Sequence, residues 1–330
     1  GIAATRTMGT NLPAIALWGA GEHATRNILP AINAAKTLRL AGIHTRNAEV
    51  LEAQTAHWQC HGWASADEML ADEGVDIVYV ATPIGLHAAH AARVLESGKH
   101  LFCEKSLTTT LTDAETLVEM ARSRALALCT TFGPIHHPQF TALRRLIEDG
   151  KIGKVVSLTA RFGFPHLEPG NARYSAALGG GVLLDAGVYP ICLSAEILGA
   201  LPDFVSARRQ SADGYEVDTS GTAMLEFPSG AVANLEWGYG RHYRNEVEVW
   251  GETGSIFAHR AFSKPPDLTT ELIVRKQDGE NTVEIPAADI FVTMLDAQVN
   301  CLDDPARREA YWTRALDHQR LVEQVIEASS

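Results

Sequence analysis

Residues 13–24 read Pro-Ala-Ile-Ala-Leu-Trp-Gly-Ala-Gly-Glu-His-Ala. The first six residues are apolar enough for a buried strand, and a helical stretch to residue 35 follows the turn. In the G-x-G-x-x-A pattern of this turn, the first glycine permits a sharp bend and the second lets the backbone approach a pyrophosphate. The alanine keeps the helix close to the sheet. The stretch therefore predicts a dinucleotide-binding Rossmann domain. Its predicted cofactor contacts are Gly19, Gly21, Glu22, His23 and Ala24.

The end of the second predicted strand, residues 38–44, distinguishes NADP from NAD. Chains that bind NAD carry an acid there, which hydrogen-bonds the ribose 2′-hydroxyl. Here the strand is followed by Thr45 and Arg46. Arg46 can pair bidentately with a 2′-phosphate, and Thr45 can donate a further hydrogen bond. The sequence therefore favours NADP(H), with a solvated loop arginine as the alternative interpretation of Arg46.

Strands and helices alternate along the rest of the first half. A helix over residues 66–72 precedes a strand over 76–81, and a helix over 88–97 precedes a strand over 100–103. This alternation predicts a parallel sheet with helical crossovers. Because ligands bind at the carboxyl ends of such strands, both strand ends belong to the predicted cofactor site. The residues predicted there are Ala81, Thr82, Pro83, Leu86, His87 and Glu104.

After residue 153 the pattern changes to short strands separated by turns, which predicts an antiparallel meander. A helical block over residues 181–198 interrupts the series, and an amphipathic helix over 305–328 is expected to pack back on the body. A chain of 330 residues favours two domains, which we place at residues 1–132 and 133–330. The predicted strands cover residues 155–164, 204–210, 219–227, 231–238, 246–250 and 271–276.

The composition limits the class of partner. A formal net charge of −12 argues against nucleic acid or an anionic membrane surface. No run of 18 or more apolar residues occurs, so no membrane span is predicted, and residues 1–11 read as a loose arm without the pattern of a secretory signal. The five cysteines are scattered and form no Cys-x-x-Cys pair. We therefore expect buried thiols in a reducing cytoplasm, without disulfides or a zinc site.

A second stretch that carries chemistry is residues 180–190, Gly-Gly-Val-Leu-Leu-Asp-Ala-Gly-Val-Tyr-Pro. Asp185 and Tyr189 stand four residues apart, so a helix presents both on one face. The alternative is a helix start that packs a domain, with an acid that stabilises its first turn. His136 and His137 are not expected to bind a metal, because adjacent histidines seldom converge on one ion and no third ligand is spaced nearby.

These motifs together resemble one protein family. Gly19-Ala20-Gly21, Ala81-Thr82-Pro83 with His87, Glu104-Lys105 and the stretch from Asp185 to Tyr189 come in its order and spacing. The family is that of glucose-fructose oxidoreductase and inositol dehydrogenase (Gfo/Idh/MocA), and the resemblance covers nearly the whole chain. It implies an α/β Rossmann domain followed by an α+β domain. The second domain has an open-faced, largely antiparallel sheet that holds the substrate pocket and often an oligomer interface.

The resemblance also implies roles for single residues. Lys105 matches the family's active-site lysine, Asp185 matches the acid of its Asp-x-Gly-x-His motif, and Tyr189 stands where many members carry the catalytic histidine. Two departures are present. Ser106 replaces the family's usual proline. Residues 130–138 lack the glutamate and arginine often found before the His-Pro step, so we expect substrate identity to diverge there.

The tyrosine narrows the resemblance to a subgroup. Together with Phe162-Gly163-Phe164-Pro165 and residues 260–266, it is similar to the nucleotide-diphospho-hexose 3-ketoreductases of deoxysugar pathways. This implies a nucleoside-diphosphate sugar as substrate, and the family implies a homo-oligomer formed through the C-terminal sheet. Arginines bind phosphate bidentately and aromatic rings stack on nucleobases, although scattered surface charge is an alternative for each arginine. The predicted substrate contacts are Phe164, Arg173, Tyr174, Tyr243 and Arg260.

The expected chemistry is hydride transfer from nicotinamide C4 to a carbonyl carbon. Tyr189 would give a proton to the carbonyl oxygen, while the ammonium of Lys105 would lower the pKa of that phenol and polarise the carbonyl. Asp185 would anchor a substrate hydroxyl or Lys105. Two alternatives stay open: an NADP-dependent dehydrogenase of a free aldose, inositol or diol, and a non-catalytic NAD(P)-binding regulator.

Overall fold

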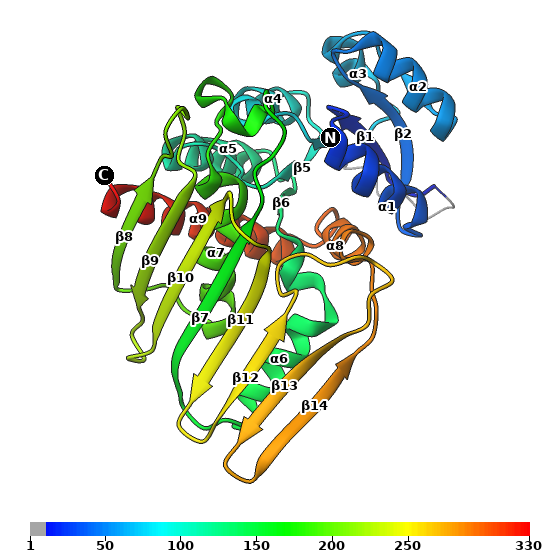
Figure 1. Cartoon of the computed structure of the whole chain (residues 1–330). Helices are drawn as coiled ribbons and strands as arrows, with labels where there is room; N and C mark the ends of the chain where they lie inside the picture. Colours follow the sequence, from blue (N-terminus) through cyan, green and yellow to red (C-terminus); the bar gives the residue numbers. More distant parts are fainter. Residues whose placement is uncertain (1–10) are drawn as a thin grey trace.

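The computed structural model describes residues 11–330 and contains two sheets (Figure 1). The first sheet has six parallel strands in the order β3-β2-β1-β4-β5-β6. The strand order reverses at β1, so the prediction of a Rossmann sheet is confirmed. Residues 1–10 of the predicted loose arm lie outside the described residues. The strands are β1 (Ala14–Trp18), β2 (Arg39–His44), β3 (His61–Gly62), β4 (Ile77–Val80), β5 (His100–Glu104) and β6 (Leu128–Thr131).

Helices connect these strands. Three of them start at a side-chain cap, in which Asn47, Ser65 or Thr110 accepts a hydrogen bond from the first turn. Helix α4 begins at Ile84, four residues before its predicted start, because Pro83 directly precedes it and proline suits a helix start. The helices are the π-helix η1 (Ala24–Ile28), α1 (Leu29–Ala34), α2 (Ala48–Trp58), α3 (Ala66–Ala71), α4 (Ile84–Glu96) and α5 (Leu111–Ser123).

The second sheet has eight strands in the order β14-β13-β12-β11-β7-β10-β9-β8. Neighbouring strands are antiparallel except β7 and β10, which run parallel. The mostly antiparallel sheet is confirmed, but the simple meander is wrong. The helical excursion after β7 lets the chain return at the far edge as β8, so β7 ends between β10 and β11. The strands are β7 (Val155–Phe164), β8 (Phe204–Gln210), β9 (Ser220–Glu226), β10 (Val232–Tyr239), β11 (Arg244–Gly251), β12 (Gly254–His259), β13 (Thr270–Lys276) and β14 (Gly279–Ile285).

One face of this sheet is covered by helices and the other is open (Figure 1). The covering helices are α6 (Pro138–Glu148), α7 (Val188–Leu198) and α9 (Pro305–Ala328). Side chains alternate along each strand, as shown by β7, where Leu158 and Phe162 are buried in the core and Arg161 is exposed. On the open face Trp250 is 63% exposed. The core therefore lies between the sheet and its helices.

The C-terminal helices join the two sheets. Helix α8 (Ile290–Val299) packs on α1 and places Phe291 5.2 Å from the ring of His23. Helix α9 has the predicted bounds, and its Trp312 Nε1 donates to Leu126 O at 3.2 Å. Beyond its other end, Arg209 Nε of β8 donates to Ser329 Oγ at 2.8 Å. The last helix therefore contacts both halves, and the domain division at residue 132 stays a prediction.

One described segment, Ala176–Leu198, is long and apolar enough to meet a length-and-hydropathy test for a membrane span, with a mean hydropathy of 1.6. This differs from the sequence prediction, because the helical turns that precede α7 lengthen the apolar stretch. Within the fold, 56% of the tested window is buried. Such burial is typical of a core helix, and α7 packs against β7 and β10.

Candidate active site

The predicted phosphate turn follows β1 directly. Gly19 has a φ of 96°, which favours glycine, and its N–H donates to His44 O at 2.8 Å. A Cβ at Gly19 would stand 2.9 Å from Thr82 Cγ2, whereas a Cβ at Gly21 would meet nothing within 4 Å. The turn is thus packed on one side and open on the other, as a backbone that receives a pyrophosphate must be.

The other predicted cofactor residues differ in exposure. Ala24 is buried in the core beside β1, whereas Glu22 is exposed and pairs with Arg26 at 3.4 Å. Ala81 follows β4, and its N–H donates to Trp18 O at 2.8 Å. Pro83 and Leu86 are half-buried at the start of α4. Ala24 therefore packs the helix on the sheet, whereas Ala81 belongs to the segment that packs against Gly19.

Thr45 and Arg46 directly follow the second strand, β2, as predicted. Thr45 is half-buried and Arg46 is exposed. Arg46 makes no ion pair with any residue between 11 and 330, in contrast to Arg26, which pairs with Glu22. An arginine without a carboxylate of its own keeps its donors available for a phosphate.

Glu104, a predicted cofactor contact, is occupied by protein groups. Its carboxylate accepts hydrogen bonds from the Tyr79 hydroxyl and from Thr131 Oγ1 at 2.9 Å, and it stands 3.1 Å from His23 Nε2. Burial alone would raise the pKa of Glu104, but His23 and the hydrogen bonds outweigh it and hold the pKa at about 2. Glu104 is therefore an ionised support that fixes the ring of His23 near the phosphate turn.

His87, another predicted cofactor contact, is fully buried. Its ring nitrogens lie 2.7 Å from Thr82 O and 2.8 Å from Ser106 O. The ring therefore ties the turn after β4 to the turn after β5 and leaves no surface for a ligand. The Lys105–Ser106 peptide bond in the second turn is cis, and Ser106 Oγ donates to Leu184 O at 3.3 Å. The expectation of a direct contact from His87 needs correction, because burial turns this side chain into a support.

Lys105, Asp185 and Tyr189 lie together between the two sheets. Asp185 belongs to the π-helix η5 (Leu183–Gly187), and Tyr189 is the second residue of α7 (Val188–Leu198). Lys105 Nζ donates to the backbone carbonyl of Asp185, stands 3.8 Å from Asp185 Oδ1 and lies 4.7 Å from the centre of the Tyr189 ring. Asp185 Oδ1 also pairs with Arg173 Nε at 2.9 Å. The structure thus gathers two cations, one carboxylate and one phenol.

Burial sets the electrostatics of this cluster. It lowers the pKa of Lys105, an effect that the charge of Asp185 opposes. It raises the pKa of Tyr189, and the negative charges of Glu104 and Asp185 raise it further. The expectation that Lys105 lowers the pKa of Tyr189 is therefore wrong, because desolvation of the phenolate dominates. Tyr189 stays protonated across the physiological pH range, as a proton donor must be before it reacts.

Hydrogen bonds to Asp218 hold the turn that carries Asp185. Asp218 Oδ2 accepts a hydrogen bond from Leu183 N–H at 2.8 Å, and Asp218 O accepts one from Val182 N–H at 2.9 Å. Gly187 packs against the fully buried indole of Trp237, and a Cβ at Gly187 would stand 2.9 Å from that ring. The glycine between Asp185 and Tyr189 therefore lets the turn pack on the sheet.

We predict that Gly187→Ala lowers the free energy of unfolding by about 1–3 kcal/mol, because the added methyl overpacks against Trp237. The turn must also shift, so turnover should fall more steeply than the folded fraction. Urea denaturation and steady-state kinetics at a temperature where the variant is folded check both effects. A variant with the wild-type denaturation midpoint and kcat would contradict this account of the glycine.

The predicted substrate residues fall into two groups. Near Asp185, Arg173 is paired with the carboxylate, and the Tyr174 hydroxyl accepts a hydrogen bond from Leu167 N–H at 2.8 Å. Phe164 packs near them, 5.5 Å from Tyr239. The second group is Arg260, whose guanidinium carbon lies 5.1 Å from the centre of the Tyr243 ring. Arg260 makes no ion pair with the described residues and has a φ of 58°, in the left-handed region.

Several residues of the site were missed by the sequence predictions. Tyr239 donates a hydrogen bond to Asp185 Oδ2 at 2.8 Å. Three phenylalanines surround the Tyr189 ring at centroid distances of 5.7 Å (Phe132), 5.6 Å (Phe162) and 6.2 Å (Phe262). Phe262 follows Arg260 by two residues and so links the second group to Tyr189. The sequence signals for Phe162 and Phe262 were the two subgroup stretches, residues 162–165 and 260–266, and neither stretch predicts a contact with Tyr189.

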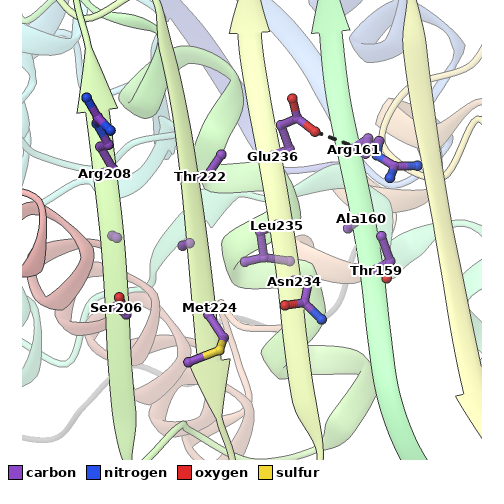
Figure 2. Close-up of a pocket in the computed structure, with 12 residues that line it drawn as sticks. Thr159, Ala160, Arg161, Ser206, Arg208, Thr222, Met224, Asn234, Leu235 and Glu236 are labelled. Carbon is purple, nitrogen blue, oxygen red and sulfur yellow. Dashed lines mark ion pairs between the residues drawn. The ribbon is translucent and has the colours of Figure 1, made fainter.

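A shallow hollow of about 400 Å³ lies on the open face of the second sheet, away from the face that packs on α7 (Figure 2). Figure 2 shows side chains from β8, β9, β10 and β7 lining it, with Arg161 3.7 Å from Glu236. It brings no nucleophile or acid–base pair together.

Within residues 11–330 no three His, Cys, Asp or Glu side chains are grouped to hold a metal. His137 Nδ1 instead accepts a hydrogen bond from Gln139 N–H at 3.0 Å.

A Rossmann sheet and an open-faced sheet with a lysine, an acid and a tyrosine between them define a two-domain nicotinamide-dependent oxidoreductase. Residues 14–132 match the profile of the oxidoreductase family with an NAD-binding Rossmann fold, and residues 140–257 match that of the GFO/IDH/MocA C-terminal domain. The chain belongs to the Gfo/Idh/MocA oxidoreductase family. The predicted resemblance is confirmed, and the alternative of a non-catalytic regulator is set aside.

Several relatives are named as enzymes that act on sugars. The chain is 33% identical over 298 residues to a dTDP-3,4-didehydro-2,6-dideoxy-α-D-glucose 3-reductase of Saccharopolyspora spinosa, covering 88% of this chain and 90% of that protein. A 3-ketoreductase from Actinomadura kijaniata, solved with NADP and TDP-benzene, has a TM-score of 0.93 at 31% identity, with 97% and 98% coverage. An aldose-aldose oxidoreductase from Caulobacter crescentus, solved with glycerol, has a TM-score of 0.87 at 25% identity, with the same coverage.

The Actinomadura enzyme has also been solved in variant forms. One variant replaces a tyrosine by phenylalanine, and two others replace one lysine by alanine or glutamate. Lysine and tyrosine are the residue types that this chain places 4.7 Å apart, ammonium to ring centre, in the cluster around Asp185.

Proposed function

We propose that this protein catalyses the NADPH-dependent reduction of a keto group on a nucleotide-linked deoxyhexose. The observation that carries the proposal is the contact of Lys105 with both Asp185 and the ring of Tyr189, next to a phosphate turn of the Rossmann type. The Saccharopolyspora and Actinomadura relatives reduce or bind thymidine-diphosphate compounds, which favours a dTDP-linked ketosugar as substrate.

The residues would divide the chemistry as follows. NADPH, when bound, supplies the hydride that reduces the carbonyl carbon to an alcohol carbon. Tyr189 gives its phenolic proton to the carbonyl oxygen, which becomes the hydroxyl, and regains a proton from solvent after the product leaves. The ammonium of Lys105 polarises the carbonyl and stabilises the charge that develops on its oxygen. Asp185 holds Lys105, and the phenylalanines around Tyr189 exclude water from the transfer.

The phosphate turn and Arg46 fit the cofactor. Gly21 leaves space for the pyrophosphate, Glu104 holds His23 near it, and Arg46 pairs with no carboxylate of residues 11–330 that would compete with a 2′-phosphate. Thr45 offers a further hydrogen bond beside Arg46. Pro83 and Leu86, after β4, would border the nicotinamide side of the same crevice.

We predict that Arg46→Ala raises the KM for NADPH about 10–100-fold, the loss expected for hydrogen bonds to a charged group. The KM for NADH should change little, because NADH has no 2′-phosphate. Arg124→Ala, which removes an exposed arginine at the end of α5, is the matched control. Steady-state kinetics with both cofactors check the prediction, and equal losses for NADPH and NADH would assign Arg46 another role.

The predicted substrate residues around Arg173 and those around Arg260 suit different parts of a nucleotide-linked substrate. Arg173 is already paired with Asp185, so it can reach a phosphate only in part. Arg260 has no acidic partner in the described part of the chain and lies over Tyr243, which favours it as the diphosphate ligand. Phe164 and Tyr174 would border the sugar on the Asp185 side. These assignments are testable by binding without any turnover.

The binding test is a fluorescence titration of the protein with NADPH and NADH, repeated with and without dTDP. The proposal expects tighter binding of NADPH than of NADH, saturable dTDP binding to the NADPH complex, and loss of the dTDP effect in Arg260→Ala. An NADH preference would contradict the cofactor assignment. Absence of any dTDP effect would favour the second candidate, a dehydrogenase of a free aldose, for which the aldose-aldose oxidoreductase of Caulobacter is the supporting relative.

We also propose that the open sheet face forms a homo-oligomer. It exposes Trp250 and carries the hollow of Figure 2, whose charged side chains could pair with those of a second copy. Sedimentation velocity should show a species larger than the monomer, which Trp250→Glu shifts toward monomer. A wild type that stays monomeric at micromolar concentration would exclude the interface.

We further propose that the domains divide at residues 1–132 and 133–330. A cytoplasmic location is also proposed, because the five cysteines are free thiols.

A further inference from the structure

Tyr239 ends β10 at the side of the catalytic cluster. Its hydroxyl donates to Asp185 Oδ2 at 2.8 Å, and the residue is only 3% exposed. The ring packs on Phe164 at 5.5 Å and on Tyr174 at 5.6 Å. Packing therefore fixes the position of this hydroxyl without help from a ligand.

The two oxygens of Asp185 have different partners. Oδ2 receives the Tyr239 hydroxyl, while Oδ1 faces two cations, Arg173 Nε at 2.9 Å and Lys105 Nζ at 3.8 Å. A carboxylate held on both oxygens cannot rotate about its Cβ–Cγ bond without losing one of these contacts. The hydrogen bond from Tyr239 thus keeps the negative charge of Oδ1 directed at Lys105.

We infer that Tyr239 is a positioning residue for the hydride-transfer site: its hydroxyl orients Asp185, and Asp185 holds the ammonium of Lys105 against the ring of Tyr189. Within residues 11–330 Tyr239 makes neither a hydrogen bond nor a ring contact with Lys105 or Tyr189, so its effect passes through the carboxylate. The ammonium needs this partner, because its side chain is 14% exposed and desolvation disfavours its charge.

The test is the single-turnover rate of NADPH oxidation in Tyr239→Phe, which loses the hydroxyl and keeps the ring. We expect a rate about tenfold below wild type, the loss of one hydrogen bond to a charged group, with the NADPH dissociation constant unchanged. Partial unfolding would instead lower the amplitude and leave the rate constant alone. Tyr215→Phe is the matched control, because Tyr215 stacks in the same aromatic group and its hydroxyl faces His166.

A double-mutant cycle separates action through Asp185 from general loosening. In an Asp185→Asn background, Tyr239→Phe should slow the reaction much less than in the wild type, because the ionised acceptor is gone. Equal effects in both backgrounds would overturn the inference, as would a wild-type rate in Tyr239→Phe or an equal loss in Tyr215→Phe.

This inference rests on the proposed function only for the choice of substrate. The assay uses dTDP-3,4-didehydro-2,6-dideoxy-α-D-glucose. If the wild type does not reduce it, the proposed function fails, and the same variants are compared in the NADP-dependent oxidation of a free aldose. Failure of the positioning role is then seen separately, as a wild-type rate in Tyr239→Phe with whichever substrate is turned over.

Discussion

Tyr189→Phe should lower kcat about 10²–10⁴-fold, the range that a positioned general acid contributes. The variant loses one oxygen atom and keeps the ring that packs between Phe132, Phe162 and Phe262. The raised pKa of Tyr189 keeps its phenol protonated and able to donate. Among the described side chains of the cluster, the ammonium of Lys105, 4.7 Å from the centre of the Tyr189 ring, is the other group that could supply a proton there. NADPH binding should be unchanged, since the turn that carries Gly19 is untouched.

Steady-state kinetics and a fluorescence titration with NADPH measure the two effects in the same preparation. Tyr311→Phe, which removes a phenol hydroxyl from α9, is the control and should keep the wild-type kcat. If Tyr189→Phe turns over at the wild-type rate, Tyr189 is not the proton donor, and Lys105 becomes the remaining candidate.

Lys105→Met should lower kcat about 10²–10³-fold, the loss typical of removing one preorganised group that stabilises transition-state charge. Methionine keeps most of the side-chain volume and removes the ammonium. Asp185 stays paired with Arg173 and Tyr239, so the acid is not left as an isolated buried charge. Lys151→Met removes an exposed lysine and is the control for the loss of charge.

The pH profile gives an independent check on Lys105. Burial lowers its pKa below the ordinary value of 10.5, and burial raises that of Tyr189. As the pH rises, the ammonium of Lys105 is therefore lost before the phenol ionises, so the alkaline decline of kcat reports Lys105. The decline should be missing from the residual activity of Lys105→Met. A decline that persists unchanged in this variant would contradict the assignment.

The sequence predicted those parts of the fold that local patterns decide. Strands over residues 155–164 and 204–210 and the helix over 305–328 have the predicted bounds, because side-chain alternation and caps act over a few residues. The turn at Gly19 was predictable for the same reason, since a glycine in the left-handed region needs only its immediate neighbours.

What the sequence could not predict depends on pairing between distant segments. The parallel pairing of β10 with β7 sets Tyr239 opposite Phe164 and brings its hydroxyl to Asp185. Asp218 likewise reaches Leu183 from the loop before β9. The burial of His87 and the raised pKa of Tyr189 arise from packing of both halves, which no local pattern encodes.

The most direct test of the proposed function compares one ketosugar in two forms. NADPH oxidation is measured with dTDP-3,4-didehydro-2,6-dideoxy-α-D-glucose and with the same sugar after removal of the nucleotide, and NMR locates deuterium delivered from [4-²H]NADPH. The proposed function predicts rapid turnover of the nucleotide-linked sugar, with deuterium on the former carbonyl carbon, and little reaction of the free sugar. Equal turnover of both forms, or turnover of neither, would contradict it.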